Sequence, residues 1–405
     1  MEKIKLAVII DQKISSGGGY QQSINAAMIA KKIPSNLADV IFYTTVKENI
    51  KTLKDFNIEA NFINFSFLSK VRTYFYRIIK ERKIISFFRL FERNNPREKI
   101  FIKDNVDLVY FLSPTSWPID LEKTNYITTI WDLSHRDDPE FPEVRWGREF
   151  ERRENNYRSI LPAATAVLVD SKLSKENITN RYGVDNDRVF EMPFQASIFT
   201  RKESNFRDND IDIKKKYELN VPYVFYPAQF WSHKNHIYIL EGLKDLEVNF
   251  GLKVGAIFCG EDKGNLSHIK DCAYKLKLLE RIRFIGFVPN SEMPYLYKQS
   301  IALVMPTYFG PTNLPPIEAF ELGTPVLYSD LKGMRDQVED AALMLDLSDS
   351  KTLANHLKDL IENDQIAKKL IQKGKEKIRD LNAFDHLNVL KIIIKKFIFK
   401  RKTWK

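Results

Sequence analysis

Short runs of β-branched and aromatic residues alternate with longer helical stretches along the whole chain. The first run, Ile4–Ile10, predicts a buried strand; three glycines at positions 17–19 and a helix over about 21–32 follow it. Further strands are predicted at residues 40–45, 107–112, 127–130 and 166–170. Strands that alternate with helices predict a parallel sheet with crossover helices.

The same alternation resumes in the second half, after a polar stretch without apolar periodicity at 201–216. Strands are predicted there at residues 223–226, 255–259, 283–285, 302–305 and 326–328. The predicted fold class is therefore α/β, with two Rossmann-like doubly wound domains facing a cleft. The predicted segments are an N-terminal domain at 1–200, a linker at 201–220, a C-terminal domain at 221–385 and a basic helix at 386–405. Chemistry is expected in the loops after the strands, where ligands bind in such sheets.

Composition narrows the class of protein. The chain has 405 residues, of which 44% are hydrophobic, and only two cysteines, Cys259 and Cys272. Two cysteines make no disulfide framework and no structural zinc site, and they favour a reducing compartment. The sequence has no apolar run of about 18 residues and no signal-peptide pattern at its start, so a cytoplasmic protein is predicted.

The formal net charge of +10 is concentrated in two segments. Residues 70–103 hold eleven basic and three acidic side chains, and residues 387–405 hold seven basic and none acidic. Both are interleaved with bulky apolar residues, which is typical of a peripheral segment on the anionic inner face of a cell membrane. In the alternative interpretation the apolar faces are core and the lysines are simply solvated. No nucleic-acid-binding motif accompanies the charge, so nucleic acid is not predicted as a partner.

Several strand-end loops carry polar groups. The glycines at 17–19 allow close backbone approach to a ligand, although a plain tight turn explains them equally well. Residues 131–140 bring His, Asp and Arg side chains to the end of a strand, where acid–base groups are useful. Asp208, Asp210 and Asp212 have an alternate spacing but lack the glycine and glutamate of a calcium loop. They are interpreted as solvated linker charge, and no metal site is predicted.

The second half holds the more informative loops. Lys234 follows a strand and precedes a helix, a position that suits a phosphate. Farther on, a strand ends in a Pro/Gly-rich loop, a helix begins near Pro316, and Gly323 caps that helix. Glu318 lies in its first turn, where it either complements the helix dipole or reaches a ribose hydroxyl pair.

Taken in order, these segments resemble a retaining GT-B glycosyltransferase of family 4, also called group 1. The resemblance spans nearly the whole chain. The matching segments are the Gly-rich first loop, Asp-Leu-x-His at 132–135, Val-Asp-Ser at 169–171, Tyr-Gly-Val at 182–184, Lys-Asn at 234–235, Phe-Ile-Gly-Phe-Val at 284–288 and Pro-Pro-Ile-Glu-Ala at 315–319.

The resemblance implies transfer of a sugar from a nucleotide-sugar to a glycan or lipid-linked acceptor, with retention and without a metal ion or other cofactor, in surface polysaccharide or glycolipid assembly. The implied catalytic residues are Lys234, which would neutralise the leaving diphosphate, and His135, which would lie beside the donor sugar. The implied donor-binding residues are Gly18, Gly19, Gln229, Lys234, Val288, Thr312, Asn313, Leu314 and Glu318. Among these, Glu318 would bind the ribose and the main chain near Val288 the base.

Two positions depart from the family pattern. Gly310 stands where the family often has a sugar-contacting glutamate, and Gln229 stands where it often has arginine. In one interpretation Thr312, Asn313 and backbone groups take over the sugar contacts. The alternatives are a non-catalytic binding protein with a decayed donor site and, less favoured, a nucleotide-sugar epimerase.

Overall fold

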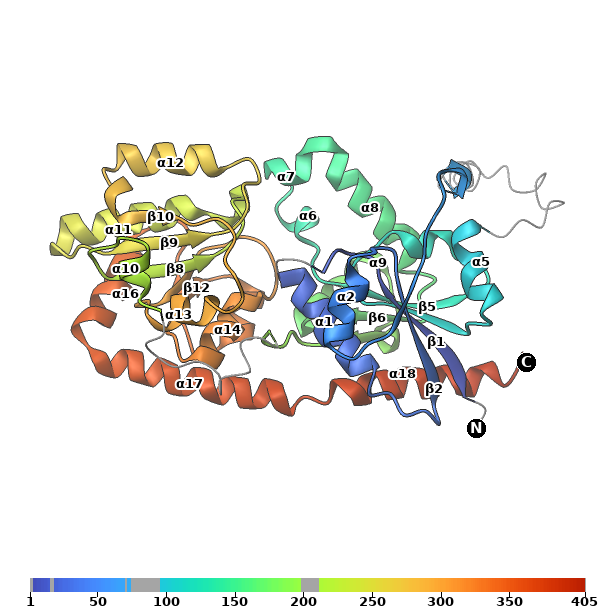
Figure 1. Ribbon diagram of the computed structural model, residues 1–405. Coiled ribbons are helices and arrows are strands. Elements are labelled where there is room, and N and C mark those ends of the chain that lie inside the picture. Colours follow the sequence, from blue (N-terminus) through green and yellow to red (C-terminus); the bar gives the residue numbers. More distant parts are fainter. Residues whose placement is uncertain (1–2, 15–17, 70, 74–94, 198–210, 405) are drawn as a thin grey trace. The chain divides into compact units, whose positions relative to one another are not determined.

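A computed structural model describes residues 3–14, 18–69, 71–73, 95–197 and 211–404 (Figure 1). The chain forms two compact units. The first consists of residues 1–131, 151–193 and 385–405, and the second of residues 132–150 and 194–384. These units differ from the segments predicted from sequence, because the loop at 132–150 joins the second unit and the C-terminal helix joins the first.

The first unit is built on a seven-stranded parallel sheet with the order β3-β2-β1-β4-β5-β6-β7. Its strands are β1 (Ile4–Ile10), β2 (Ala38–Thr44), β3 (Ala60–Phe62), β4 (Leu108–Phe111), β5 (Asn125–Ile130), β6 (Ala166–Val169) and β7 (Val189–Glu191). Its helices are α1 (Gly18–Ala30), α2 (Asn49–Asp55), α5 (Pro96–Lys103), α8 (Glu149–Ile160), α9 (Lys172–Tyr182) and α18 (His386–Arg401), with short 3₁₀ turns η1 (Trp117–Asp120) and η3 (Asn186–Arg188).

The second unit is built on a six-stranded parallel sheet with the order β10-β9-β8-β11-β12-β13. Its strands are β8 (Tyr223–Pro227), β9 (Gly255–Cys259), β10 (Ile282–Phe284), β11 (Leu303–Met305), β12 (Val326–Ser329) and β13 (Leu343–Leu345). Its helices are α6 (Ser134–Asp137), α7 (Pro142–Arg145), α10 (Ile213–Lys216), α11 (His236–Phe250), α12 (Leu266–Lys275), α13 (Met293–Lys298), α14 (Leu314–Leu322), α15 (Lys332–Val338), α16 (Lys351–Glu362) and α17 (Asp364–Ala383), with 3₁₀ turns η2 (Trp146–Arg148), η5 (Ser232–Lys234) and η6 (Leu279–Arg281). The predicted α/β class with two Rossmann-like sheets is confirmed.

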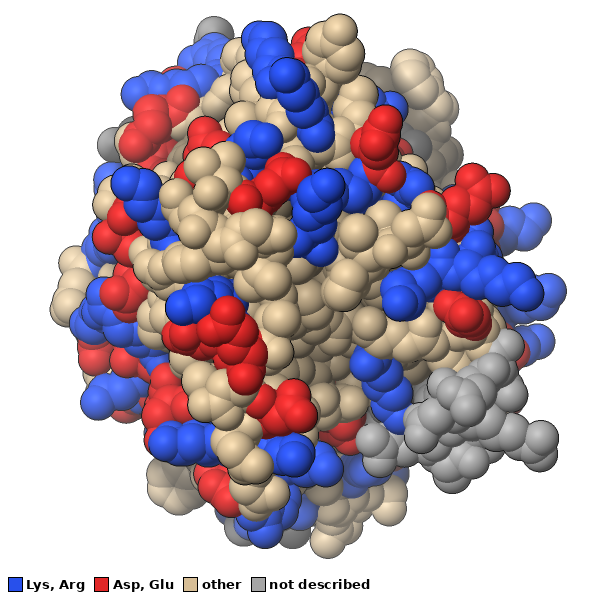
Figure 2. Space-filling model, turned by 90° about the vertical axis from the view of Figure 1, so that its left-hand side faces the viewer, with Lys and Arg blue, Asp and Glu red and all other residues tan. Residues whose placement is uncertain are grey.

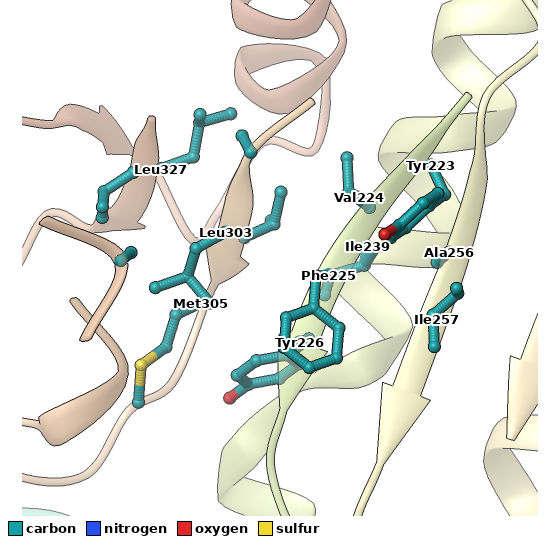
Figure 3. Close-up of a cluster of buried hydrophobic side chains, with 14 of the residues drawn as sticks. Tyr223, Val224, Phe225, Tyr226, Ile239, Ala256, Ile257, Leu303, Met305 and Leu327 are labelled. Atoms are coloured by element: carbon teal, nitrogen blue, oxygen red, sulfur yellow. The ribbon is translucent and has the colours of Figure 1, made fainter. Parts of the chain in front are cut away.

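The central strands are apolar along their length because helices cover both faces of each sheet. In β8 the side chains of Tyr223, Val224 and Phe225 are all buried. Figure 3 shows them gathered with side chains of α11, β9, β11 and β12 in the core of the second unit. The short strands β3, β7 and β13 were not predicted from sequence. Each has only three residues, and each is partly exposed, so each is too short to give a clear strand pattern in the sequence.

Helix α18 completes the core of the first unit, where it lies beside α1 (Figure 1). The side chains of Leu390, Ile393, Ile394, Phe397 and Ile398 belong to the same buried cluster as β1. At the end of the helix the buried Arg401 guanidinium pairs with Asp107. The apolar face of residues 387–405 therefore packs in the protein core. The expectation that this face contacts a membrane is wrong.

The other charged segments are placed as follows. Most of the basic segment 70–103 lies outside the described residues, as do Asp208 and Asp210. Asp212 accepts a hydrogen bond from the backbone of Lys215 at the start of α10. On the face that carries α11 and α16, basic and acidic side chains are interspersed (Figure 2). Among the described residues, none of the helices is long and apolar enough to span a bilayer.

Candidate functional site

Lys234 lies where the first strand of the second unit turns into its first long helix. It ends the 3₁₀ turn η5, and Asn235 in the left-handed conformation (φ 54°) redirects the chain into α11. The hydroxyl of the buried Tyr226 donates to the Lys234 carbonyl at 3.0 Å and anchors the turn on the core. The sequence prediction of a lysine between a strand and a helix start is confirmed.

The Lys234 side chain is half-buried among charged neighbours. Burial lowers the pKa of its ammonium to about 8, while the carboxylates of Asp132 and Glu143 oppose the shift. Both carboxylates come from the 132–150 segment, which counts with the second unit. The ammonium is therefore protonated below about pH 8 and provides a fixed positive charge in this loop cluster.

The 132–150 segment also brings His135 into the second unit. The α6 turn begins where the Ser134 backbone donates to Asp132 at 2.9 Å, and the Ser134 hydroxyl accepts from the Gly310 backbone at 3.3 Å. The His135 ring has no exposed surface and lies 5.6 Å from the ring of Phe150. In this conformation, direct contact between His135 and a bound sugar would require the segment to shift.

The Pro/Gly-rich loop after β11 is held by hydrogen bonds around Asn313. Its side-chain amide donates to the Phe309 carbonyl at 3.2 Å and to the Tyr328 hydroxyl at 2.7 Å. Its backbone N–H donates to Gln337 at 2.9 Å. These donors of Asn313 hold the loop itself, which is a different role from the sugar contact expected from sequence. The side chains of Pro315 and Pro316 remove two further N–H groups from the start of α14.

Gly310 has a conformational reason to be glycine. Its φ is +95°, and a Cβ atom there would lie 2.9 Å from the Thr312 carbonyl oxygen. A glutamate at this position would be strained in this loop conformation. The backbone conformation of this loop therefore favours glycine at position 310 over the glutamate of the family pattern.

Gln229, the other departure, accepts a hydrogen bond from the Trp231 indole at 3.1 Å. Its loop passes so close to β9 that a Cβ on Gly260 would lie 2.4 Å from the Ala228 carbonyl oxygen. The side chain of Gln229 therefore contacts its own loop in this structure.

Glu318 lies in α14, as predicted, and is almost fully buried. One carboxylate oxygen accepts a hydrogen bond from the Tyr297 hydroxyl at 2.9 Å. Burial and the carboxylate of Glu318 together raise the pKa of the Cys259 thiol, so this cysteine is an unreactive core residue. Gly323 ends the helix at φ 71°, which confirms the predicted cap.

The other predicted donor residues lie in both units. In the second unit, Val288 and Leu314 are buried, and Thr312 lies between Gly310 and Asn313 in the loop after β11. Gly18 and Gly19 begin α1 in the first unit, where a Cβ on Gly19 would lie 2.8 Å from the Trp131 ring.

Asp11, at the end of β1 in the first unit, was not singled out from sequence. Burial raises the pKa of its carboxyl, opposed by hydrogen bonds from Thr115 and Ser113 and by the charge of Arg97. Its position directly after a buried strand was the available signal.

Sequence reasoning also missed the pair formed by His233 and Glu143. The Glu143 carboxylate accepts hydrogen bonds from the His233 backbone, at 2.9 Å, and from the His233 ring nitrogen Nδ1. Ninety residues separate the two, and no local pattern links them. Within the described part of the chain, no group of His, Cys, Asp and Glu residues could hold a metal ion.

Known proteins share this fold along their whole length. A glycosyltransferase from Rickettsia africae superposes with a TM-score of 0.69 at 16% identity, covering 98% of this chain and 99% of that one. HepE of Anabaena in complex with UDP superposes with a TM-score of 0.68 at 16% identity, covering 99% and 100%. The fold is therefore that of the GT-B glycosyltransferases.

The sequence comparisons point to the same class. Residues 208–377 match the family described as glycosyl transferases group 1. The chain is also 25% identical over 284 residues to the O-antigen chain mannosyltransferase B of Escherichia coli, covering 67% of this chain and 70% of that protein. These findings place the chain among the glycosyltransferases, with the group 1 match confined to the second unit. They leave retention and the family 4 subtype as predictions.

Proposed function

We propose that the protein transfers a sugar from a nucleotide-sugar to a glycan or lipid-linked acceptor, with retention and without a metal ion, in surface polysaccharide or glycolipid assembly. The observation that carries the proposal is the half-buried Lys234 ammonium at the carboxyl end of β8, inside the segment that matches the group 1 family. The likeness to an O-antigen mannosyltransferase supports a polysaccharide as the product.

In the proposed reaction Lys234 stabilises the negative charge that develops on the leaving diphosphate. A preorganised cation in a partly desolvated loop cluster acts more strongly than one in water. Glu318 binds the ribose, and the backbone near Val288 the base. The first unit, with Asp11 at the end of β1, holds the acceptor in this proposal, and Gly18 and Gly19 at the start of α1 line the acceptor or the donor phosphates.

Calorimetric titration with UDP-, GDP- and dTDP-sugars, with no metal added, tests the donor site. We expect one nucleotide class to bind wild-type protein. Absence of binding for all three would favour the alternative function, a non-catalytic binding protein with a decayed donor site. That alternative is motivated by Gly310 and by the Gln229 side chain, which hydrogen-bonds within its own loop. An epimerase would convert the donor without any acceptor.

Glu318→Gln should weaken donor binding by roughly tenfold or more, because the ribose hydroxyls lose a charged acceptor, and such hydrogen bonds contribute about 1.5–3 kcal/mol. Glutamine still accepts the bond from Tyr297. Thermal stability should therefore change little, whereas Glu318→Ala should also destabilise the fold. The measurement is the calorimetric Kd of each variant for the bound nucleotide-sugar. An unchanged Kd for Glu318→Gln would reduce Glu318 to a structural residue at the helix start.

We also propose that the protein acts at the inner face of the membrane, through the outward side of α18. Phe399 on this helix and Trp404, three residues after its end, are 75% and 57% exposed, and lysines 395, 396, 400 and 402 in the same stretch are exposed as well. Basic charge around exposed aromatic rings fits an anionic lipid surface.

Replacing both Phe399 and Trp404 by Ala should lower binding to phosphatidylglycerol vesicles at low salt by about tenfold, because apolar burial contributes about 25 cal/mol per Å². Co-sedimentation measures the bound fraction. Tyr274→Ala, which removes an equally exposed aromatic ring from α12, is the matched control. Equal binding of all three proteins would remove α18 from membrane contact.

A further inference from the structure

His233 joins three separate loops of the second unit. Its carbonyl accepts hydrogen bonds from the Tyr308 backbone at 2.9 Å and from the Thr307 hydroxyl at 3.3 Å. Its ring stacks on Phe309 with centroids 4.0 Å apart and planes 7° apart. Its backbone N–H and ring Nδ1 both bond to Glu143. The loop after β8, the loop after β11 and the 132–150 segment therefore meet at one side chain.

The protonation states of the pair agree with this geometry. Burial lowers the pKa of His233 to about 4, only partly offset by Glu143, so its imidazole is neutral near pH 7. Burial opposes ionisation of Glu143, but the hydrogen bonds from His233 outweigh it and hold the pKa of that carboxyl below its usual range. A neutral ring facing a carboxylate through Nδ1 must carry its proton on Nδ1.

We propose that Glu143 is a positioning residue for the transfer reaction: through its two hydrogen bonds to His233 it fixes the turn that presents Lys234. The inference rests on the proposed function, in which Lys234 must be charged to stabilise the leaving diphosphate. Lys234 directly follows His233, whose backbone N–H is itself bonded to Glu143, so loss of the Glu143 carboxylate frees the backbone just before Lys234.

Among the described residues, two carboxylates and two histidines interact electrostatically with the Lys234 ammonium. Asp132 and Glu143 from the 132–150 segment favour the charged form. His233 and His236 also face it and are neutral near pH 7, since burial lowers the pKa of His236 to about 3. Burial is the main cause of the low pKa of Lys234, and the carboxylates of Asp132 and Glu143 counteract part of this shift.

Glu143→Gln separates the charge from the geometry. Glutamine accepts the same two hydrogen bonds, so turnover at pH 6.5 should stay within about threefold of wild type. The alkaline fall in kcat, near pH 8 in wild type, should move to lower pH by about half a unit or more, because an opposite charge nearby is lost. Glu143→Ala also removes the hydrogen bonds and should lower kcat at pH 6.5 by about tenfold or more with a smaller change in KM.

Glu247→Gln is the matched control, because Glu247 also pairs with two cations, Lys244 and Arg281, but late in α11. Its pH profile should equal that of wild type. An unshifted alkaline limb in Glu143→Gln, with transfer activity intact, would overturn the charge role of Glu143.

Nitrogen-15 NMR of the histidine rings gives a readout that needs no substrate. The chain has six histidines, and His233→Gln identifies the signal of interest. We expect a neutral Nδ1–H tautomer from pH 5.5 to 8.5, lost in Glu143→Ala. If no nucleotide-sugar is turned over but this signal behaves as expected, the proposed function is wrong, whereas the hydrogen-bonded pair of His233 and Glu143 is confirmed. A His233 signal that titrates near its ordinary pKa, or that ignores Glu143→Ala, would overturn the positioning role.

Discussion

Lys234→Ala should lower the rate of sugar transfer by at least about 100-fold, equivalent to roughly 2.7 kcal/mol of lost transition-state stabilisation. The ammonium is half-buried, so water replaces it poorly as a partner for the leaving diphosphate. The backbone of the turn is held independently, through the Tyr226 hydroxyl and the His233 carbonyl. The loss should therefore appear in kcat while the melting temperature stays near that of wild type. Single-turnover kinetics with the donor identified by calorimetry measure it.

Two further variants make this result specific to Lys234. Lys253→Ala removes an exposed lysine from the same unit and should leave turnover unchanged. Lys234→Arg keeps the charge but enlarges the group, and should retain part of the activity. Wild-type turnover in Lys234→Ala would exclude this lysine from the mechanism and would favour a reaction that does not develop charge beside η5.

Ile394→Ala should destabilise the first unit by about 3 kcal/mol, because it removes a fully buried side chain and leaves a cavity. The side chain packs in the core shared by α18 and β1. Hydrogen exchange in peptides from α1 and α18, followed in increasing urea, reports this loss for the first unit separately from the second.

Ile392→Ala is the matched control, since Ile392 lies on the same helix and is 39% exposed. It should change stability by less than about 0.5 kcal/mol. Equal exchange in both variants would mean that α18 does not complete the core in solution.

The sequence was sufficient for the fold class because the long strands carry unmistakable apolar runs. The predicted bounds of β1 and β9 equal those in the structure, and β8 and β12 differ by one residue. The packing of α18 against the first unit could not be predicted in the same way. Its basic and apolar residues alternate as they would in a membrane-surface helix, and only the tertiary structure decides what covers the apolar side.

The position of candidate site residues was predictable where they lie next to each other in sequence, as Lys234 and the start of α11 do. It was not predictable where distant residues meet. His233 lies next to Lys234, yet its importance depends on Glu143, ninety residues earlier, and on the Phe309 ring. Similarly, the hydrogen bonds of Asn313 to Tyr328 and Gln337 gave it a role in holding the loop that its sequence position did not reveal.

The return of α18 to the first unit affects the order in which the protein can fold during synthesis. Residues 132–150 and 194–384 contain the whole second unit, so it can fold while the ribosome is still translating. The first unit leaves the ribosome earlier but must wait for residues 385–405 to cover its apolar surface. The unit that is made first is thus finished last. During that interval, the exposed strip beside α1 is where a chaperone would bind or where two nascent chains would aggregate.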